Sequence, residues 1–196
     1  MRKLHLEKKF IYLIVPLILY VISVDMNTLK AQVLIPQKDG TKNVILLNGI
    51  WKFKYIPSIN IKDDSIFFKS DFNIGTWSTI KVPGNWELQG FAEPMYGGAL
   101  KEGTGLYRTT FIIPTEWKNQ LIYLAFDGVQ YGYELWVNGK YAGSFASSFN
   151  RQTFDITKLI KPGAENILAV KVSTRSKGWD FDTNDDWSLS GIIRDV

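Results

Sequence analysis

The feature that most constrains the fold is a hairpin signal near the middle of the chain. Residues 133–137 and 140–145 are both rich in aromatic and aliphatic side chains, and the pair Asn138-Gly139 separates them. Asn-Gly is the pair that a type I′ turn requires, because both central residues of that turn have a positive φ. The sequence therefore predicts an antiparallel hairpin here.

Further apolar runs indicate more strands, and these runs cover residues 50–56, 107–113, 120–127 and 166–173. In the first run Trp51, Phe53 and Tyr55 alternate with lysines, which is typical of a half-buried strand. The run 120–127 is apolar on both faces, and this pattern predicts an inner strand covered on both sides.

Helical signals are few and short. Residues 66–72 fit a short helix, and residues 155–160 fit a single capped helical turn closed by Pro162-Gly163. Short strands joined by turns, without alternating helices, are typical of two packed sheets. The sequence therefore predicts an all-β sandwich.

The first 31 residues have the character of an export signal. Basic residues precede an apolar run at 10–24, and Ala31 offers a small residue for cleavage. A membrane anchor is the alternative, but 15 residues that include Pro16 fall short of the about 20 that span a bilayer. We expect a signal peptide at 1–31, a flexible segment at 32–44 and a β-sandwich at 45–196, in a periplasmic or secreted protein.

Cleavage would remove most of the positive charge. Lys plus Arg falls from 23 to 18 and Asp plus Glu from 19 to 17, because residues 1–31 hold five basic and two acidic side chains. A domain near neutrality lacks the basic face that nucleic acids need. The only histidine, His5, also leaves, and the chain has no cysteine. We therefore expect no Ser-His or Cys-His nucleophile, no metal site of His or Cys, no cofactor, no nucleic-acid partner and no membrane contact after cleavage.

Residues 179–187 combine four aspartates, one asparagine and two tryptophans. Tryptophan rings offer flat apolar faces to a sugar, whereas tryptophans inside strands, such as Trp51, Trp77 and Trp136, are expected in the core. The alternating oxygen ligands from Asp180 to Asp186 begin like a calcium loop. The pattern then fails, because Asp185 stands where a glycine is needed and Gly191 where a glutamate is needed. An acidic, solvated loop is the alternative to a binding site, and no metal is predicted.

Catalysis by this chain alone is not expected. A glycosidase holds two carboxyl groups about 5–5.5 Å or about 6.5–9.5 Å apart on either side of one sugar bond. Neither the acidic stretch nor the scattered Glu87, Glu93 and Glu102 gives a reason for such spacing. We predict no catalytic residue.

Seven short motifs occur in a fixed order along the chain, namely Asn48-Gly49-Ile50-Trp51-Lys52-Phe53, Val82-Pro83-Gly84-Asn85-Trp86-Glu87, Thr104-Gly105-Leu106-Tyr107-Arg108, Phe126-Asp127-Gly128-Val129, Trp136-Val137-Asn138-Gly139, Phe154-Asp155-Ile156-Thr157 and Leu189-Ser190-Gly191-Ile192-Ile193-Arg194-Asp195-Val196. Together they resemble the N-terminal sugar-binding domain of glycoside hydrolase family 2, the family of β-galactosidases, β-glucuronidases and β-mannosidases. The resemblance implies a jelly-roll β-sandwich of the galactose-binding-domain type.

The resemblance also implies further domains. In the family, an immunoglobulin-like domain and a TIM barrel follow the sandwich, and the barrel supplies both catalytic glutamates, one of them in an Asn-Glu pair. This sequence has no Asn-Glu dipeptide and ends at Val196. We expect a fragment, truncated in its last strand, of an exported glycosidase that hydrolyses O-glycosyl bonds. Its expected partners are a β-glycoside and the two missing domains. A free-standing carbohydrate-binding module and an oligomer-interface domain are the alternatives.

The candidate sugar-binding residues follow from the same resemblance and from the acidic-aromatic stretch. They are Trp179, Asp182, Asn184, Asp185, Trp187 and Glu102. Asp185 matches an acidic position two residues before Trp187 in the family pattern. Lys177 and Glu102 depart from the β-galactosidase pattern, which has an aspartate and an asparagine at these positions near the sugar. The two departures argue against a lactase-type specificity.

Overall fold

The computed structural model describes residues 43–61, 65–96, 102–177, 179–182 and 187–196. Its contacts divide the chain into two units, Met1–Val44 and Ile45–Val196, and the second unit carries every element described below. In the described ranges, no helix combines the length and the apolar composition needed to cross a membrane.

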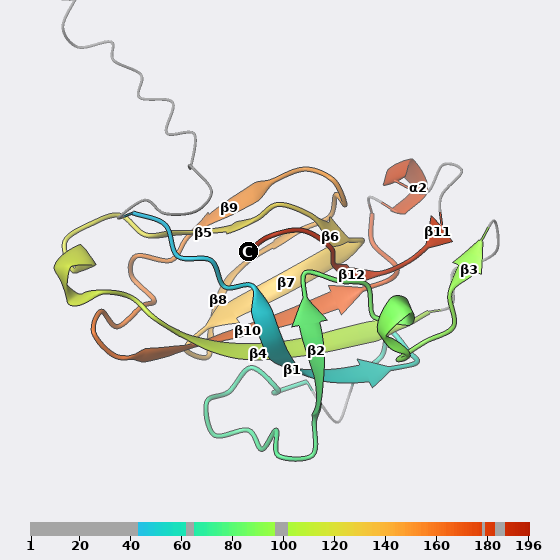
Figure 1. Ribbon diagram of the computed structural model, residues 1–196, viewed down its shortest axis with the longest axis horizontal. Coiled ribbons are helices and arrows are strands. Elements are labelled where there is room, and N and C mark those ends of the chain that lie inside the picture. Colours follow the sequence, from blue (N-terminus) through green and yellow to red (C-terminus); the bar gives the residue numbers. More distant parts are fainter. Residues whose placement is uncertain (1–42, 62–64, 97–101, 178, 183–186) are drawn as a thin grey trace, which may run out of the picture. The chain divides into compact units, whose positions relative to one another are not determined.

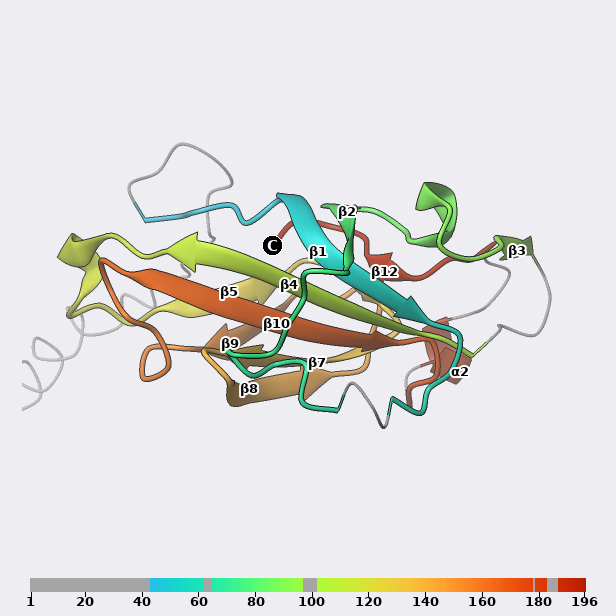
Figure 2. The ribbon, with the colours of Figure 1, turned by 90° about the horizontal axis from the view of Figure 1, so that it is seen from below.

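One layer of the second unit is a six-stranded antiparallel sheet (Figures 1 and 2). Its strands, in spatial order, are β2 (Ser78–Val82), β1 (Gly49–Ile56), β4 (Thr104–Ile112), β10 (Glu165–Ser173), β7 (Gly132–Val137) and β8 (Lys140–Phe145). Trp51 and Phe53 of β1 are buried and the lysine between them is exposed, which confirms the alternation predicted for this strand.

The facing layer consists of short two-stranded pairs. These are β5 (Tyr123–Phe126) with β9 (Gln152–Asp155), and β6 (Val129–Gln130) with β12 (Gly191–Ile192). A third pair, β3 (Met95–Tyr96) with β11 (Trp187–Ser188), lies at one end of the unit (Figure 1). Three helical segments of three or four residues complete the described elements, namely η2 (Glu87–Gln89), η3 (Thr115–Trp117) and α2 (Trp179–Asp182).

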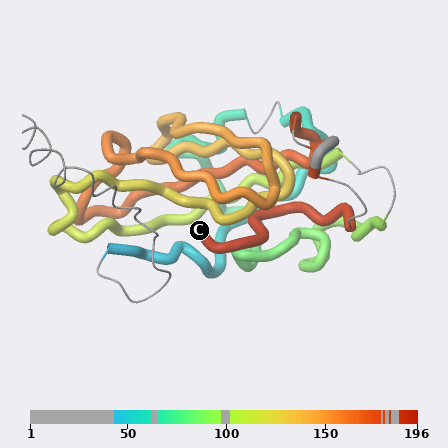
Figure 3. The backbone as a smooth tube through the Cα atoms, turned by 90° about the horizontal axis from the view of Figure 1, so that it is seen from above, coloured from blue at the N-terminus to red at the C-terminus, as the bar shows by residue number. Residues whose placement is uncertain are grey.

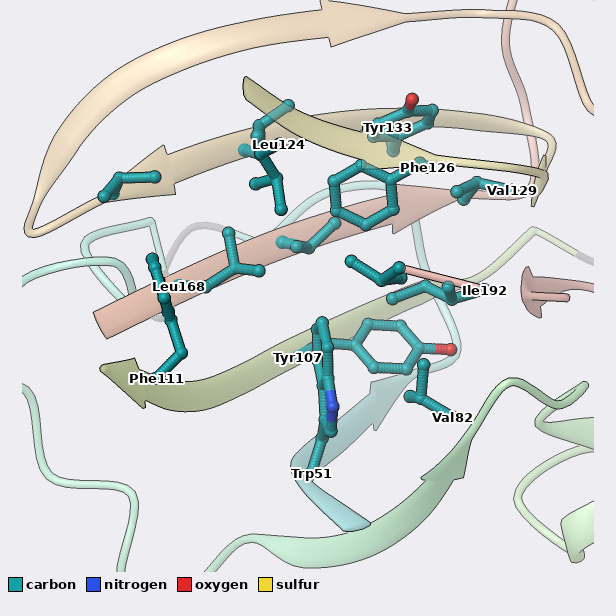
Figure 4. Close-up of a cluster of buried hydrophobic side chains, with 14 of the residues drawn as sticks. Trp51, Val82, Tyr107, Phe111, Leu124, Phe126, Val129, Tyr133, Leu168 and Ile192 are labelled. Atoms are coloured by element: carbon teal, nitrogen blue, oxygen red, sulfur yellow. The ribbon is translucent and has the colours of Figure 1, made fainter. Parts of the chain in front are cut away.

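The core fills the space between the two layers. Figure 4 shows Leu124, Phe126 and Val129 pointing from the short pairs toward Tyr107 and Leu168 of the large sheet. All five side chains are at most 6% exposed, as expected for close-packed layers. The prediction of an all-β sandwich is therefore confirmed.

The hairpin predicted at Asn138-Gly139 is also confirmed. The two residues have φ values of 52° and 77°, as a type I′ turn requires. The Asn138 side chain adds a second function, because its Nδ2 donates to the Leu159 carbonyl at 2.8 Å and its Oδ1 accepts from the Ile167 amide at 2.9 Å. This asparagine therefore ties the hairpin to the start of β10.

Two predictions about secondary structure are wrong. Residues 120–127 do not form an inner strand covered on both sides, because Leu121 and Tyr123 are 68% and 57% exposed. The pair β5–β9 has only one face on the core, and sequence periodicity does not distinguish exposed apolar side chains from buried ones. Residues 66–72 form successive turns rather than a helix, with Lys69 N donating to the Ile66 carbonyl and Phe72 N to the Lys69 carbonyl.

Hydrogen bonds from Arg108 hold these turns over the outer face of the large sheet. Its side chain is only 5% exposed, and its Nη1 donates to the carbonyls of Phe67, Lys69 and Phe72 at 3.4, 3.0 and 3.3 Å. Burial lowers the pKa of the guanidinium. Phe67, packed beside Trp77, forms a second small core beneath the turns.

The C-terminal residues are hydrogen-bonded to two other segments of the domain. Val196 accepts a hydrogen bond from Leu47 N at 2.8 Å, and Asp195 accepts one from Asp127 N at 3.0 Å. Figure 3 shows this segment running between the two chain regions that it bonds. Gly191 precedes it with φ at 130°, and a Cβ there would lie 2.7 Å from the Gly84 carbonyl, so this position requires glycine.

Replacement of Arg108 by methionine should destabilise the domain by about 2–4 kcal/mol, because three carbonyls lose their common donor. Urea unfolding of the purified protein measures this change. The matched control is Lys52→Met, since Lys52 lies directly opposite Arg108 in the β1–β4 register and is exposed. The control should change stability by no more than about 0.5 kcal/mol. Equal effects of the two substitutions would contradict the anchoring role.

Candidate functional site

One end of the sandwich carries the candidate sugar-binding residues that the structure describes. Figures 1 and 2 both place α2, β3 and β11 at this end. Gly103 N donates to Thr174 Oγ1 at 2.9 Å and Thr174 N donates to the Gly103 carbonyl at 3.1 Å. These bonds bring exposed Glu102 beside the segment that connects β10 to α2. Asn184 and Asp185 lie outside the described residues.

Asp182 is engaged within the domain. Its Oδ2 accepts hydrogen bonds from the amide and the hydroxyl of Ser148 at 2.7 and 2.9 Å, and Ser148 is fully buried. This carboxylate therefore fastens α2 to the connection between β8 and β9. Trp179 is partly buried, with the Arg175 guanidinium 4.4 Å from its ring centre. Both residues belong to the framework of this end of the sandwich.

Trp187 is a candidate that faces solvent. It lies opposite Tyr96 in the β11–β3 pair, and the two ring centres are 5.2 Å apart with an interplanar angle of 52°. The side chains of Trp187 and Tyr96 are 50% and 59% exposed. We call these two residues the aromatic pair. Tyr96 was missed in the sequence because β3 has only two residues, too few to show an alternation.

A groove of about 550 Å³ lies at the ends of β7, β8 and β10. One wall is formed by Arg175, Ser176 and Lys177. The rest of the lining comes from the hairpin strands β7 and β8 with Ala146, and from Ser173 at the end of β10. Among the described residues, the Tyr133 hydroxyl and the Ser176 hydroxyl have no hydrogen-bond partner, and burial raises the pKa of Tyr133. A groove with hydroxyl groups and cations suits a polar ligand. The sequence did not reveal it, because its lining combines the hairpin strands β7 and β8 with the later strand β10 and the segment that follows it.

Glu87 is a buried carboxyl group beneath the aromatic pair. It is 6% exposed, and its Oε2 accepts a hydrogen bond from Ser190 N at 2.8 Å. Burial raises the pKa of Glu87, and the hydrogen bond from the Ser190 amide opposes the shift without cancelling it. Such a group is inaccessible to a large substrate. In the described part of the chain, no three His, Cys, Asp or Glu side chains are grouped as metal ligands would be.

Replacement of Asp182 by alanine should loosen α2, because the buried Ser148 amide loses its acceptor. Hydrogen exchange at the Ser148 amide should then accelerate by at least about tenfold. Asp155→Ala is the control, since Asp155 Oδ1 accepts from the Thr157 amide in the same manner elsewhere. That variant should leave Ser148 exchange unchanged. If Asp182→Ala also leaves it unchanged, the carboxylate does not fasten this helix.

Comparison with known proteins agrees with the sandwich and with the motif order. A family profile described as "Glycosyl hydrolases family 2, sugar binding domain" matches residues 44–196. The β-galactosidase of Priestia megaterium is 33% identical over 167 residues, which cover 76% of this chain and 16% of the relative. The β-galactosidase of Psychromonas ingrahamii is 35% identical over 163 residues, with 77% and 16% covered. The chain thus spans about 16% of the length of these curated relatives.

Solved structures show the same relationship. The crystal structure of a β-glucuronidase from Bacteroides uniformis superposes with a TM-score of 0.61 and 25% sequence identity. The match covers 77% of this chain and 17% of that enzyme.

Proposed function

Since this chain belongs to the sugar-binding domain of glycosyl hydrolase family 2, we propose that it is the non-catalytic N-terminal part of an exported β-glycosidase. In this proposal the domain binds a β-glycoside and supports further domains that hydrolyse the O-glycosyl bond. The short share of the relatives' length that the chain covers supports the second half of the proposal.

The observation that carries the sugar-binding function is the exposed aromatic pair. A tryptophan and a tyrosine that remain half exposed beside each other offer an apolar face, and the C–H side of a pyranose ring can stack on such a face. The hydroxyl-lined groove at the same end supplies hydrogen-bonding groups. Stacking together with hydrogen bonding is the combination that sugar recognition needs.

The described carboxyl groups support a role without catalysis. A retaining or inverting glycosidase needs two accessible carboxyl groups on opposite sides of one bond. At this end of the domain, Asp182 is bonded to Ser148 and Glu87 is buried. Neither is placed to protonate or attack a glycosidic bond.

A free-standing carbohydrate-binding module is the second candidate function. It is favoured by the groove, whose lining residues all belong to this unit and need no other domain to form. The two candidates share the same binding end and differ in whether a catalytic domain belongs to the same protein.

Export is supported by the basic and apolar pattern of residues 1–31. After expression in a bacterial host, the protein recovered from the periplasm should begin at Gln32, as determined by N-terminal sequencing. Recovery only from the cytoplasm with Met1 intact would contradict export.

The purified protein should hydrolyse no aryl β-glycoside, yet it should bind one. In calorimetric titration with 4-nitrophenyl β-D-galactopyranoside and 4-nitrophenyl β-D-glucuronide, Trp187→Ala should weaken binding of the glycoside that the chain binds about 3- to 10-fold, because a stacking contact is lost. Tyr123→Ala is the control, since Tyr123 is equally exposed on β5 and outside the aromatic pair. Turnover of the glycoside would contradict the non-catalytic role. Unchanged binding by Trp187→Ala would contradict the role of the pair.

A further inference from the structure

We propose that Glu87 is the positioning residue of the sugar-binding end, and that its protonation state is coupled to the orientation of the aromatic pair. Glu87 acts from beneath the β3–β11 pair and does not touch the ligand. Only the statement that the pair contacts a sugar rests on the proposed function. The coupling between Glu87 and Trp187 stands on the geometry alone.

The segment that follows β11 is attached to Glu87 and its neighbours by hydrogen bonds. Both main-chain polar groups of Ser190 are hydrogen-bonded. Its N–H donates to Glu87 Oε2 at 2.8 Å, and its carbonyl accepts from Trp86 N at 3.0 Å. Gly84 N continues the contact by donating to the Ile192 carbonyl at 2.7 Å. Trp187 is therefore three residues from a chain position that the Glu87 carboxylate holds.

The Glu87 carboxyl group lies under both β3 and β11. A cavity of about 20 Å³ is lined by Glu87, by Met95 of β3 and by Ser188 of β11. This volume is enough for one water molecule. Met95 and Ser188 are the immediate neighbours of Tyr96 and Trp187, so a change at the carboxyl reaches both strands of the pair.

Several titratable and polar groups face the Glu87 carboxyl group. They are Tyr55 from β1, Tyr107 from β4, Glu93 from the connection before β3, and the Trp86 and Ser190 side chains. Burial raises the pKa of Tyr55 and of Tyr107, and the charge of Glu87 raises both further. Within the described residues, no lysine or arginine lines this cavity. The ionised carboxylate is thus stabilised by hydrogen-bond donors without a balancing cation.

Protonation changes the hydrogen bonding of this set. A carboxylate accepts from every neighbouring donor, whereas a carboxylic acid carries an O–H donor of its own. That O–H cannot donate to the Ser190 amide or to the Trp86 indole N–H, so its acceptor lies either at the Ser190 hydroxyl or in the cavity beneath Met95 and Ser188. Because its raised pKa favours the neutral form in the folded state, Glu87 stabilises the fold at low pH, and this contribution is lost as the pH rises through the folded-state pKa.

Fluorine NMR of the full chain labelled with 5-fluorotryptophan tests the coupling. The Trp187 resonance, assigned with Trp187→Phe, should shift with pH, with a midpoint above the ordinary pKa of a glutamate. This transition should vanish in Glu87→Gln, which keeps an acceptor oxygen for Ser190 N but does not ionise. It should persist in Glu93→Gln, which removes the other carboxyl that lines the same cavity. A transition that survives in Glu87→Gln, or a Trp187 resonance without one, would overturn the proposal.

Binding of the same two aryl β-glycosides supplies the second measurement. Glu87→Gln should bind like the unmodified chain at neutral pH, while Glu87→Leu should bind at least about fivefold more weakly, because Ser190 N loses its acceptor. Equal affinity of Glu87→Leu and the unmodified chain would refute the positioning role. If the unmodified chain binds no glycoside, the proposed function fails, and the fluorine experiment still decides the coupling.

Discussion

The pairing of β4 with β10 is the interaction on which the rest of the structure depends. Nine residues of each strand are in register, from Ile112 opposite Glu165 to Thr104 opposite Ser173. The contact continues past the strands through the two hydrogen bonds between Gly103 and Thr174. The ladder therefore builds the centre of the large sheet and brings two distant chain segments to the end of the sandwich that carries the aromatic pair.

At that end, different residues form the framework and the exposed aromatic face. Asp182 and Trp179 belong to the most polar and aromatic part of the sequence, yet the structure uses them to hold α2 in place. Trp187 remains half exposed on the two-stranded pair β3–β11. Buried polar groups such as Glu87 have a desolvation cost, and hydrogen bonds from neighbouring donors offset part of that cost.

Most of the regular strands were predictable from the sequence, because alternation and turn chemistry are local. Asn138-Gly139 identified its hairpin, since few residue pairs tolerate two successive positive φ values. The groove and Tyr96 were not predictable, because their neighbours are fixed by strand pairing over long sequence separations. The buried position of Arg108 was not predictable for a different reason. A cation within a strand pattern predicts a solvent-facing position, and only the turns over the sheet make this position buried.

Arg108 also bears on how this domain can change during evolution. Its three acceptors are main-chain carbonyl oxygens, and every residue type provides a carbonyl. The connection between β1 and β2 can therefore exchange its exposed side chains and still be held, provided that the chain keeps its path and that apolar side chains such as Phe67, Phe72 and Trp77 keep their contacts. We therefore expect exposed positions of this connection to accept substitutions. We expect Arg108, which donates hydrogen bonds to its main chain, to accept few. Related chains should accordingly diverge on the covering segment before they diverge beneath it.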